Sequence, residues 1–256
     1  MSGASPRDWD AATYQRVSVP HEEWARSILD RLELAGDERV LDAGCGSGRV
    51  TAMLIERLPE GSVVAVDGSP SMIDEVRSVL RPRDEAMVAD LTELRLDEPV
   101  DVVFSSATFH WIADHDRLFA RLFAALKPGG RLVAQCGGAG NIAPVVEALD
   151  DVTAEPPFAE HFAGWRGPWN YAGPGETVAR LERAGFVEAR AGLHDEPVQP
   201  DDPHEFFETI MLGSHLARLP DEQRAPFVDR VLSELGEPVI VEYVRLTMSA
   251  QRPEAA

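Results

Sequence analysis

The chain has 256 residues, of which 44% are hydrophobic and 27% charged, and acidic residues outnumber basic ones 44 to 24. Such a composition is typical of an ordinary globular protein. A formal net charge of −20 argues against nucleic acid and anionic membranes as partners, because both bind to lysine- and arginine-rich surfaces. An apolar signal core and a membrane-spanning run are not evident, and two cysteines are too few for a disulfide framework, so we expect a cytoplasmic protein.

Strand and helix signals alternate along the chain, which predicts a doubly wound, mostly parallel seven-stranded α/β sheet. The expected strands are residues 39–43, 62–66, 85–89, 100–104, 131–135, 186–193 and 239–248. The expected helices are residues 22–32, 50–58, 70–80, 118–126, 176–184, 203–219 and 221–235.

No linker divides the chain, so we predict one domain, residues 1–256, with additions to its core. Residues 1–36 are interpreted as an N-terminal helical segment, and residues 138–175 and 200–237 as lid insertions, the first with one short helix. Aromatic side chains in the first insertion could line a substrate pocket, but we favour a lid core for them: Phe158, Phe162, Trp165, Trp169 and Tyr171.

The most specific motif runs from Val40 to Gly48, where a strand ends, glycines turn the backbone sharply and a helix begins. Its alternating glycines are Gly44, Gly46 and Gly48. The dinucleotide fingerprint needs a glycine at the sixth position from Gly44, where this chain has Arg49. A methionine moiety suits the loop better, because Asp42 can pair with its ammonium and backbone N–H groups with its carboxylate.

Two further carboxylates follow at the ends of the next two expected strands. Asp67 comes 23 residues after Gly44 and can accept hydrogen bonds from both ribose hydroxyls. Asp90, followed by Leu91, can accept from the exocyclic amine of adenine while a backbone N–H donates to the ring. Carboxylates at three successive strand ends therefore favour a ligand with an amine, a ribose and an adenine.

With these motifs, residues 10–140 resemble the class I S-adenosylmethionine-dependent methyltransferases. The matching stretches are residues 40–48, 64–69, 88–91, 101–106 and 126–130. His110-Trp111-Ile112 and residues 14–24 look most like the trans-aconitate methyltransferase subfamily, although that subfamily often has glutamine where this chain has His21. The resemblance implies S-adenosylmethionine as cofactor, S-adenosylhomocysteine as product, and these cofactor-binding residues: Tyr14, Asp42, Gly44, Cys45, Gly46, Gly48, Asp67, Gly68, Ser69, Met72, Asp90, Leu91, Ser105 and Ser106.

Methyl transfer to a carboxylate oxygen needs no general base, whereas an alcohol needs one, for which His110 and His21 are candidates. Either histidine can equally be a packed side chain. The resemblance favours a small-molecule carboxylate as acceptor, and we hypothesise that Arg166 or another lid arginine neutralises it. An NAD-dependent oxidoreductase and a non-catalytic S-adenosylmethionine-binding protein are the alternatives.

A metal site is not expected. His110 and the segment from Asp114 to Asp116 lie close in sequence, but we interpret the latter as a solvated helix start. The sequence leaves the oligomeric state open between a monomer and a homodimer.

Overall fold

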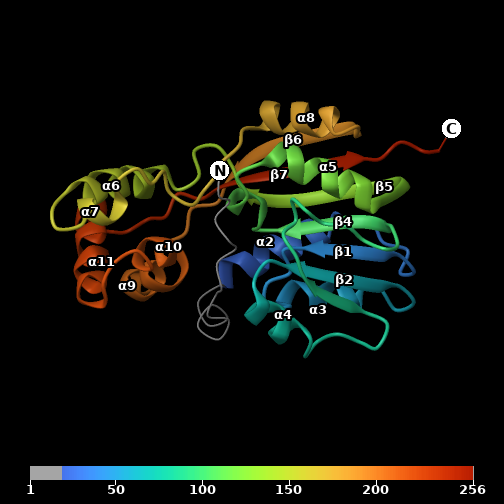
Figure 1. The fold of residues 1–256 in the computed structure, drawn as a ribbon, viewed down its shortest axis with the longest axis horizontal. Helices are drawn as coiled ribbons and strands as arrows, with labels where there is room; N and C mark the ends of the chain where they lie inside the picture. The colour runs from blue at the N-terminus through green and yellow to red at the C-terminus, as the bar shows by residue number, and fades with distance from the viewer. Residues whose placement is uncertain (1–18, 256) are drawn as a thin grey trace.

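The computed structural model describes residues 19–255, with side chains described from Trp24 onward. Its centre is one sheet of the order β3-β2-β1-β4-β5-β7-β6, in which β7 runs antiparallel to its neighbours β5 and β6 (Figure 1). The strands are β1 (Arg39–Ala43), β2 (Ser62–Asp67), β3 (Glu85–Val88), β4 (Val100–Ser106), β5 (Leu126–Gly137), β6 (Val187–Asp195) and β7 (Val244–Gln251). The other pairings are parallel, so the predicted fold class is confirmed.

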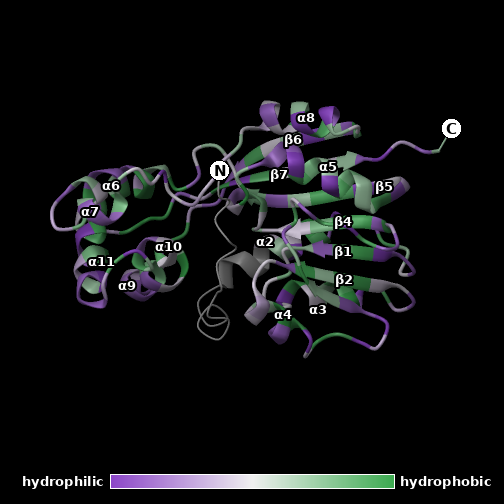
Figure 2. Ribbon diagram, viewed as in Figure 1, coloured by the Kyte–Doolittle hydropathy of each residue, from purple (hydrophilic) through white to green (hydrophobic). Residues whose placement is uncertain are grey.

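Helices cover both faces of this sheet. On one face lie α2 (Val19–Leu29), α3 (Arg49–Glu56) and α4 (Pro70–Val76), and on the other α5 (His115–Ala125) and α8 (Pro174–Arg183). Successive residues of a strand point to opposite faces, so β1 buries Val40 against the first group and Leu41 against the second. Because both faces are covered, the central strands are mostly apolar, and Figure 2 shows them as the hydrophobic centre of the sheet.

Residues 141–173 and 203–235 form a separate helical layer beyond one end of the sheet, which we call the cap (Figure 1). Its helices are α6 (Ala143–Ala154), α7 (Ala159–Phe162), α9 (Pro203–Phe206), the π-helical turn η2 (Phe207–Met211), α10 (Gly213–Leu216) and α11 (Asp221–Leu235). The two segments interpreted as lid insertions therefore pack on each other around one hydrophobic cluster. Whether they open and close as a lid stays a prediction.

Several expected elements have other bounds in the structure, among them β5, which begins at residue 126 instead of 131, and three differ more deeply. The last strand begins at residue 244, not 239, because the alternating apolar residues Val239, Val241 and Tyr243 are buried in the cap cluster instead of pairing with β5. The helix expected over residues 203–219 is broken by η2, whose widened turn directs Phe207, Ile210 and Met211 into the same cluster. The first insertion holds two helices, α6 and α7, where one was expected.

Within the described range 19–255, no helix is both long and apolar enough to cross a bilayer.

His215 of α10 is a polar ring enclosed by the aromatic side chains of the cap. Only 3% of the residue is exposed, and the ring centroid of Trp165 lies 4.7 Å away and that of Trp169 5.5 Å away. Its Nδ1 atom is buried and has no hydrogen-bond partner among the described residues. Burial, with a smaller contribution from the charge of Arg218, lowers the pKa of His215 to about 3, so the cap is built around a neutral imidazole.

We expect the cap to lose stability in mild acid because of His215. With its folded-state pKa below the ordinary value near 6.5, the unfolded chain binds a proton between about pH 6.5 and pH 3 that the folded chain excludes. The part of the unfolding free energy that depends on a neutral His215 is therefore fully present above about pH 6.5. It falls by about 1.4 kcal/mol for each pH unit below that, down to the folded-state pKa. In His215→Phe, the drop in melting temperature from pH 7.5 to 5.5 should be smaller than in wild type by about 3 °C, as measured by scanning calorimetry.

His204→Phe is the matched control, because His204 lies in the same cap but its side chain is 41% exposed. An equal acid-induced drop in His215→Phe and wild type would show that His215 does not carry the effect.

Candidate active site

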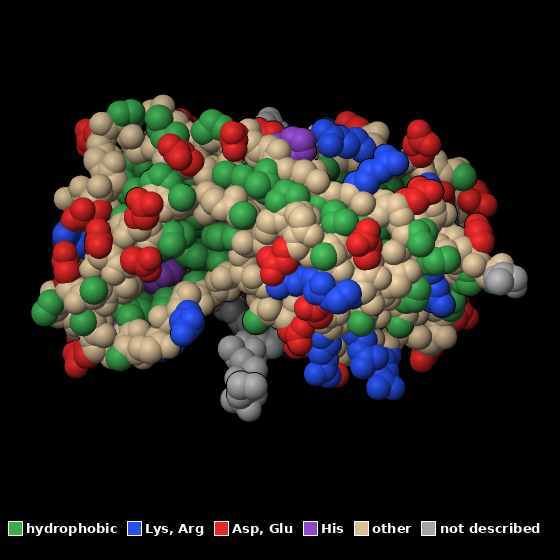
Figure 3. All heavy atoms as spheres, turned by 90° about the horizontal axis from the view of Figure 1, so that it is seen from above, with side chains coloured by type: hydrophobic (Ala, Val, Ile, Leu, Met, Phe, Trp, Pro, Cys, Tyr) green, Lys and Arg blue, Asp and Glu red, His purple; other side chains and the backbone are tan. Residues whose placement is uncertain are grey.

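A cavity of about 890 Å³ lies between the carboxyl ends of β1, β2, β3 and β4 and the cap. Figure 3 shows hydrophobic side chains in the hollow on the cap side of the molecule. In open α/β sheets ligands bind outside the carboxyl ends of the strands, near the point where the strand order reverses. Here that point is the gap between β1 and β4, because the connection from β1 leads to β2 on one side and the connection from β4 leads to β5 on the other.

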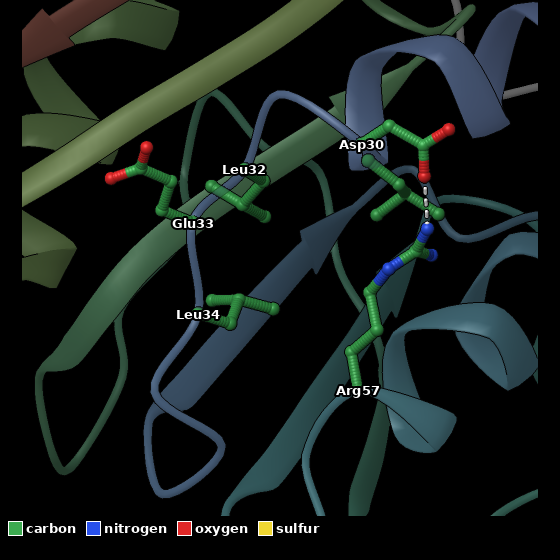
Figure 4. A pocket seen from close by; sticks show the side chains of 6 residues that line it. Asp30, Leu32, Glu33, Leu34 and Arg57 are labelled. Carbon is green, nitrogen blue, oxygen red and sulfur yellow. Dashed lines mark hydrogen bonds and ion pairs between the residues drawn. The ribbon is translucent and has the colours of Figure 1, made fainter.

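A second hollow, of about 560 Å³, lies near the amino ends of the strands (Figure 4). It is lined by the end of α2, the chain that follows it, and Arg57, whose guanidinium pairs with Asp30 at the surface. The Asp30 side chain is 62% exposed, and no group of this hollow has the buried, convergent polar character of a binding site. The larger cavity is therefore the candidate site.

The glycine turn after β1 forms one wall of the cavity. Gly44 N and Cys45 N both donate to Val66 O, at 2.7 and 3.0 Å, which folds the turn back onto the end of β2. Gly44 has a positive φ of 82°, and a Cβ added there would lie 2.1 Å from Thr108 Oγ1. A Cβ added at Gly46 would meet nothing within 4 Å, because this residue presents bare backbone to the cavity.

Asp67, at the end of β2, joins this turn to the next one. Its Oδ2 accepts from Gly46 N at 3.0 Å and its Oδ1 from Ser69 N at 2.9 Å. Burial raises the pKa of Asp67, while N–H donors from Ser69, Gly46 and Gly68 act in the opposite direction. Each carboxylate oxygen has two acceptor sites, so Asp67 can accept ligand hydroxyls while it holds the two loops.

Asp90, just beyond β3, is exposed at the cavity wall. Its Oδ1 accepts from both the backbone N and the Oγ1 of Thr92, each at 2.8 Å, so the local turn fixes the orientation of the carboxylate.

Several predicted binding residues lie beneath the cavity surface instead of on it. Asp42 is 1% exposed and accepts from Thr51 Oγ1 at 2.7 Å, so it supports the start of α3 and does not reach the cavity. Burial raises the pKa of Asp42 to about 7, opposed by the Thr51 hydrogen bond and reinforced by the charge of Asp67. The pairing with a ligand ammonium expected for Asp42 is therefore wrong as a direct contact. The others that do not line the cavity are Cys45, Gly48, Ser69 and Ser105.

Each of these buried positions has a local structural explanation. A Cβ on Gly48 would lie 2.7 Å from Val76 Cγ2, so glycine lets α3 approach α4. Ser69 caps α4 by accepting from Met72 N, and Ser105 Oγ donates to Ala43 O at 2.6 Å between β4 and β1. Burial raises the pKa of the Cys45 thiol, which disfavours the thiolate form that a nucleophile needs.

His110 lies on the short 3₁₀ helix η1 (Phe109–Trp111) that follows β4, and it is buried at the cavity wall. Its Nδ1 accepts from Gly137 N at 3.2 Å, so the neutral ring carries its proton on Nε2. His115 Nε2 donates to Phe109 O at 2.8 Å and its Nδ1 accepts from Arg180, which anchors η1 from behind. Asp114 accepts from Arg117 N, which confirms the predicted helix start.

The cap side of the cavity contains residues that sequence patterns alone did not identify. Arg245 of β7 is 4% exposed, and its Nε donates to Gln135 Oε1 at 2.8 Å, while Gln135 Nε2 donates to Ser106 Oγ at 2.7 Å. Aromatic residues expected in the lid core divide between two roles. Phe158 and Phe162 are buried in the cap, whereas the cavity is lined by Trp165, Trp169 and Tyr171.

The hypothesis names Arg166 or another lid arginine as the group that neutralises an acceptor. Arg166 is exposed and does not line the cavity, whereas Arg218 of the second insertion does. The cavity arginines are Arg218 and Arg245. Position among lid aromatics was too weak a signal, since adjacent residues in an irregular segment face different sides. Arg245 had a usable signal: it is the one basic residue in the mostly apolar strand expected over residues 239–248.

The predicted site residues that do line the cavity are Gly44, Gly46, Asp67, Gly68, Met72, Asp90, Leu91, Ser106 and His110. Tyr14 lies outside the described residues, as does the side chain of His21. Among the side chains that the structure describes, from Trp24 onward, no group of three or more histidine, cysteine or acidic residues is arranged to hold a metal ion.

A family model described as a methyltransferase domain matches residues 40–130. These residues include β1 to β4 and the turns that line the cavity at their carboxyl ends, which we call its cofactor side. A trans-aconitate 2-methyltransferase of Variovorax paradoxus is 36% identical over 243 residues, covering 93% of this chain and 88% of that protein. One of Methylobacterium nodulans is 37% identical over 157 residues, 61% of this chain and 60% of that protein. This chain thus spans less than two thirds of some relatives that it matches.

Among solved structures, phosphoethanolamine N-methyltransferase 2 of Haemonchus contortus, in complex with S-adenosyl-L-methionine, gives a TM-score of 0.61 at 21% identity. The match covers 95% of this chain and 57% of that one, and it demonstrates a shared fold. Since the Variovorax paradoxus relative is matched along nearly its whole length, this chain belongs to the class I S-adenosylmethionine-dependent methyltransferases.

Proposed function

We propose that this protein transfers the methyl group of S-adenosylmethionine to a carboxylate oxygen of a small molecule. The observation that carries the proposal is one continuous cavity, with strand-end carboxylates and bare backbone at one side and His110 with Arg245 at the other. The names of the relatives, trans-aconitate 2-methyltransferases, support a carboxylic acid as acceptor.

The residues present fit the cofactor. Because Gly46 has no side chain, the space beside its backbone is open, and a methionine moiety could approach the backbone N–H groups closely there. Asp67 keeps acceptor capacity for ribose hydroxyls, and Asp90 is held by Thr92 in one orientation toward an adenine amine. Leu91 and Met72 supply apolar surface beside the ring. Asp42 acts indirectly, by fixing the start of α3 through Thr51.

When bound, S-adenosylmethionine supplies an electrophilic methyl group on a sulfonium, from which a neutral thioether departs without needing a proton. The residues of this chain therefore have to orient the acceptor and exclude water, and holding two reactants in line can remove about 7–11 kcal/mol of the barrier. A carboxylate is already ionised at neutral pH. The tautomer of His110 places a donor at Nε2, which suits orientation of an anion better than removal of a proton.

We expect Asp67→Asn and Asp90→Asn to weaken binding of S-adenosylhomocysteine, measured by isothermal titration calorimetry. Loss of a charged acceptor should lower affinity about 10- to 100-fold. The effect should be larger at Asp67, because the amide nitrogen of an asparagine there is a donor and cannot accept from Gly46 N or Ser69 N. Asp74→Asn is the control, since Asp74 lies on nearby α4 with its side chain 84% exposed. Equal affinity in all three variants would contradict the assignment.

The same titration separates the alternatives. NAD should produce no heat and no rise in melting temperature at concentrations where S-adenosylhomocysteine stabilises the protein. An oxidoreductase would give the reverse result. A non-catalytic binding protein would bind S-adenosylhomocysteine but transfer no labelled methyl group to any acid.

We also expect kcat for a carboxylate acceptor to change less than about twofold between pH 6.5 and 9, because no base is titrated in the transfer step. Radiolabelled methyl transfer at saturating S-adenosylmethionine measures this. Saturation is needed because Asp42, with its pKa near 7, titrates beneath the binding loop in the same range. A tenfold rise of kcat per pH unit, removed in His110→Gln, would instead indicate base catalysis and an alcohol acceptor.

A further inference from the structure

The acceptor side of the cavity, which is the part that faces the cap, is lined mainly by aromatic and aliphatic side chains, with Asn141, Ser214 and Tyr243 as further polar groups. Trp169 and Tyr171 are stacked, with ring centroids 5.9 Å apart and planes at 14°, and Trp111 lies 6.1 Å from Trp169. Ile142, Ile210 and Met211, each less than 8% exposed, complete this wall. Aromatic rings at this wall favour an apolar group that can lie against one of their faces, and they pair poorly with an ionised group.

Positive charge is limited among the described lining residues. It comes from Arg245, which is buried, and Arg218, which is exposed. Asp67 and Asp90 are the carboxylates proposed to bind the cofactor, so among the described lining residues Asp114 is the carboxylate left to face an acceptor. The Arg218 guanidinium stacks 4.9 Å above the ring of Trp165 and its Nε donates to His161 O at 3.0 Å, so it lies at the rim of the cap. A compact acid with several charges would therefore leave carboxylates against aromatic or acidic groups.

Arg245 is held in a way that limits how it can bind a carboxylate. Its Nε and Nη2, the pair that forms a side-on fork with a carboxylate, both donate to Gln135 Oε1. The guanidinium also lies 4.6 Å above the ring of Trp24. Arg245 thus lies at the cavity with its Nε and Nη2 fork already occupied by Gln135. A carboxylate bound by both bonds of that fork would be a weaker nucleophile, and this arrangement avoids such binding.

We propose that the acceptor is an acid with one carboxylate on a flat apolar body, such as an aryl- or alkenyl-substituted acid, and not a compact polycarboxylate. This inference rests on the proposed methyl transfer to carboxylate. The carboxylate lies toward Arg245 and His110, and the body lies along the wall of Trp111, Trp169 and Tyr171. One carboxylate oxygen forms a bond to the methyl carbon, the sulfur–methyl bond breaks, its electron pair stays on sulfur, and no proton moves.

The test compares two unsaturated acids, trans-cinnamate with one carboxylate and a flat ring, and trans-aconitate with three carboxylates. In labelled methyl transfer, kcat/KM for trans-cinnamate should exceed that for trans-aconitate by about tenfold or more, a difference within the range that a hydrophobic pocket provides. A higher kcat/KM for trans-aconitate would overturn the inference and leave the proposed function standing.

A pair of charge variants tests the cause. Ala217 is exposed and lines the cavity, so Ala217→Arg adds a cation where a second carboxylate would lie and should narrow the preference for trans-cinnamate by about threefold. Ala225→Arg adds the same charge to the exposed surface of α11, away from the cavity, and should leave the ratio unchanged. Equal ratios in both variants would contradict a preference set by the charge of the cavity.

Binding to the protein loaded with S-adenosylhomocysteine distinguishes failure of the inference from failure of the proposed function. Calorimetry should give tighter binding of trans-cinnamate than of trans-aconitate even where turnover is slow. Tight trans-cinnamate binding with no methyl transfer to any acid would refute the carboxylate methyltransferase, while tighter trans-aconitate binding would refute the acceptor class.

Discussion

The carboxylate of Asp67 is the interaction on which the geometry of the cofactor side depends. It accepts one N–H from the glycine turn after β1 and another from the turn after β2, so two loops from neighbouring parallel strands are fixed by one side chain. A buried carboxylate is costly, and the backbone donors offset that cost because each provides a charge-assisted hydrogen bond. The two loops consequently keep their shape without a bound ligand.

A second polar chain crosses the sheet at right angles to the strands. Ser106 of β4, Gln135 of β5 and Arg245 of β7 are linked in series by side-chain hydrogen bonds. Ser106 lies in the cavity beside the glycine turn and Arg245 lies beneath the cap, so the chain connects the cofactor side to the acceptor side through rigid strands. Groups placed on adjacent strands hold their separation more precisely than groups on loops, which suits a reaction controlled by alignment.

The cofactor side could be predicted from sequence because its signals are local. In a parallel strand–turn–helix unit, the residue after the strand must lie at the carboxyl edge of the sheet, so Asp67 and Asp90 were placed correctly from their order alone. The same rule could not show that the Asp42 side chain does not line the cavity. Asp42 is within β1, and the alternation of strand side chains directs it to the face covered by α3, where Thr51 binds it.

The acceptor side depends on contacts between segments far apart in sequence. Trp169 and Met211 meet across the cavity although about forty residues separate them, and their spacing has no periodicity that would indicate it. The extended run of Val239, Val241 and Tyr243 alternates as a strand should, yet its side chains pack into the cap, and its backbone pairing is an isolated bridge between Val241 and Val198. Arg166 was chosen only for its place among the lid aromatic residues. Arg245 was overlooked because its place in the cavity depends on neighbours from distant strands, such as Gln135.

The two sides of the cavity are therefore specified by different kinds of sequence constraint. Short-range rules, in which a strand end, a glycine and a carboxylate must follow one another closely, fix the half that holds the cofactor. Only the general requirement to bury apolar area constrains the cap, and many different sets of side chains meet that requirement. Acceptor selectivity can therefore change through substitutions such as those at the cavity-facing aromatic residues, while the hydrogen bonds of Asp67 and the helix start at Thr51 stay intact. Under the proposed function, we therefore expect the identity of the acceptor to depend on the composition of the cap wall and the charge at Arg245, and not on the fold that the chain shares with its relatives.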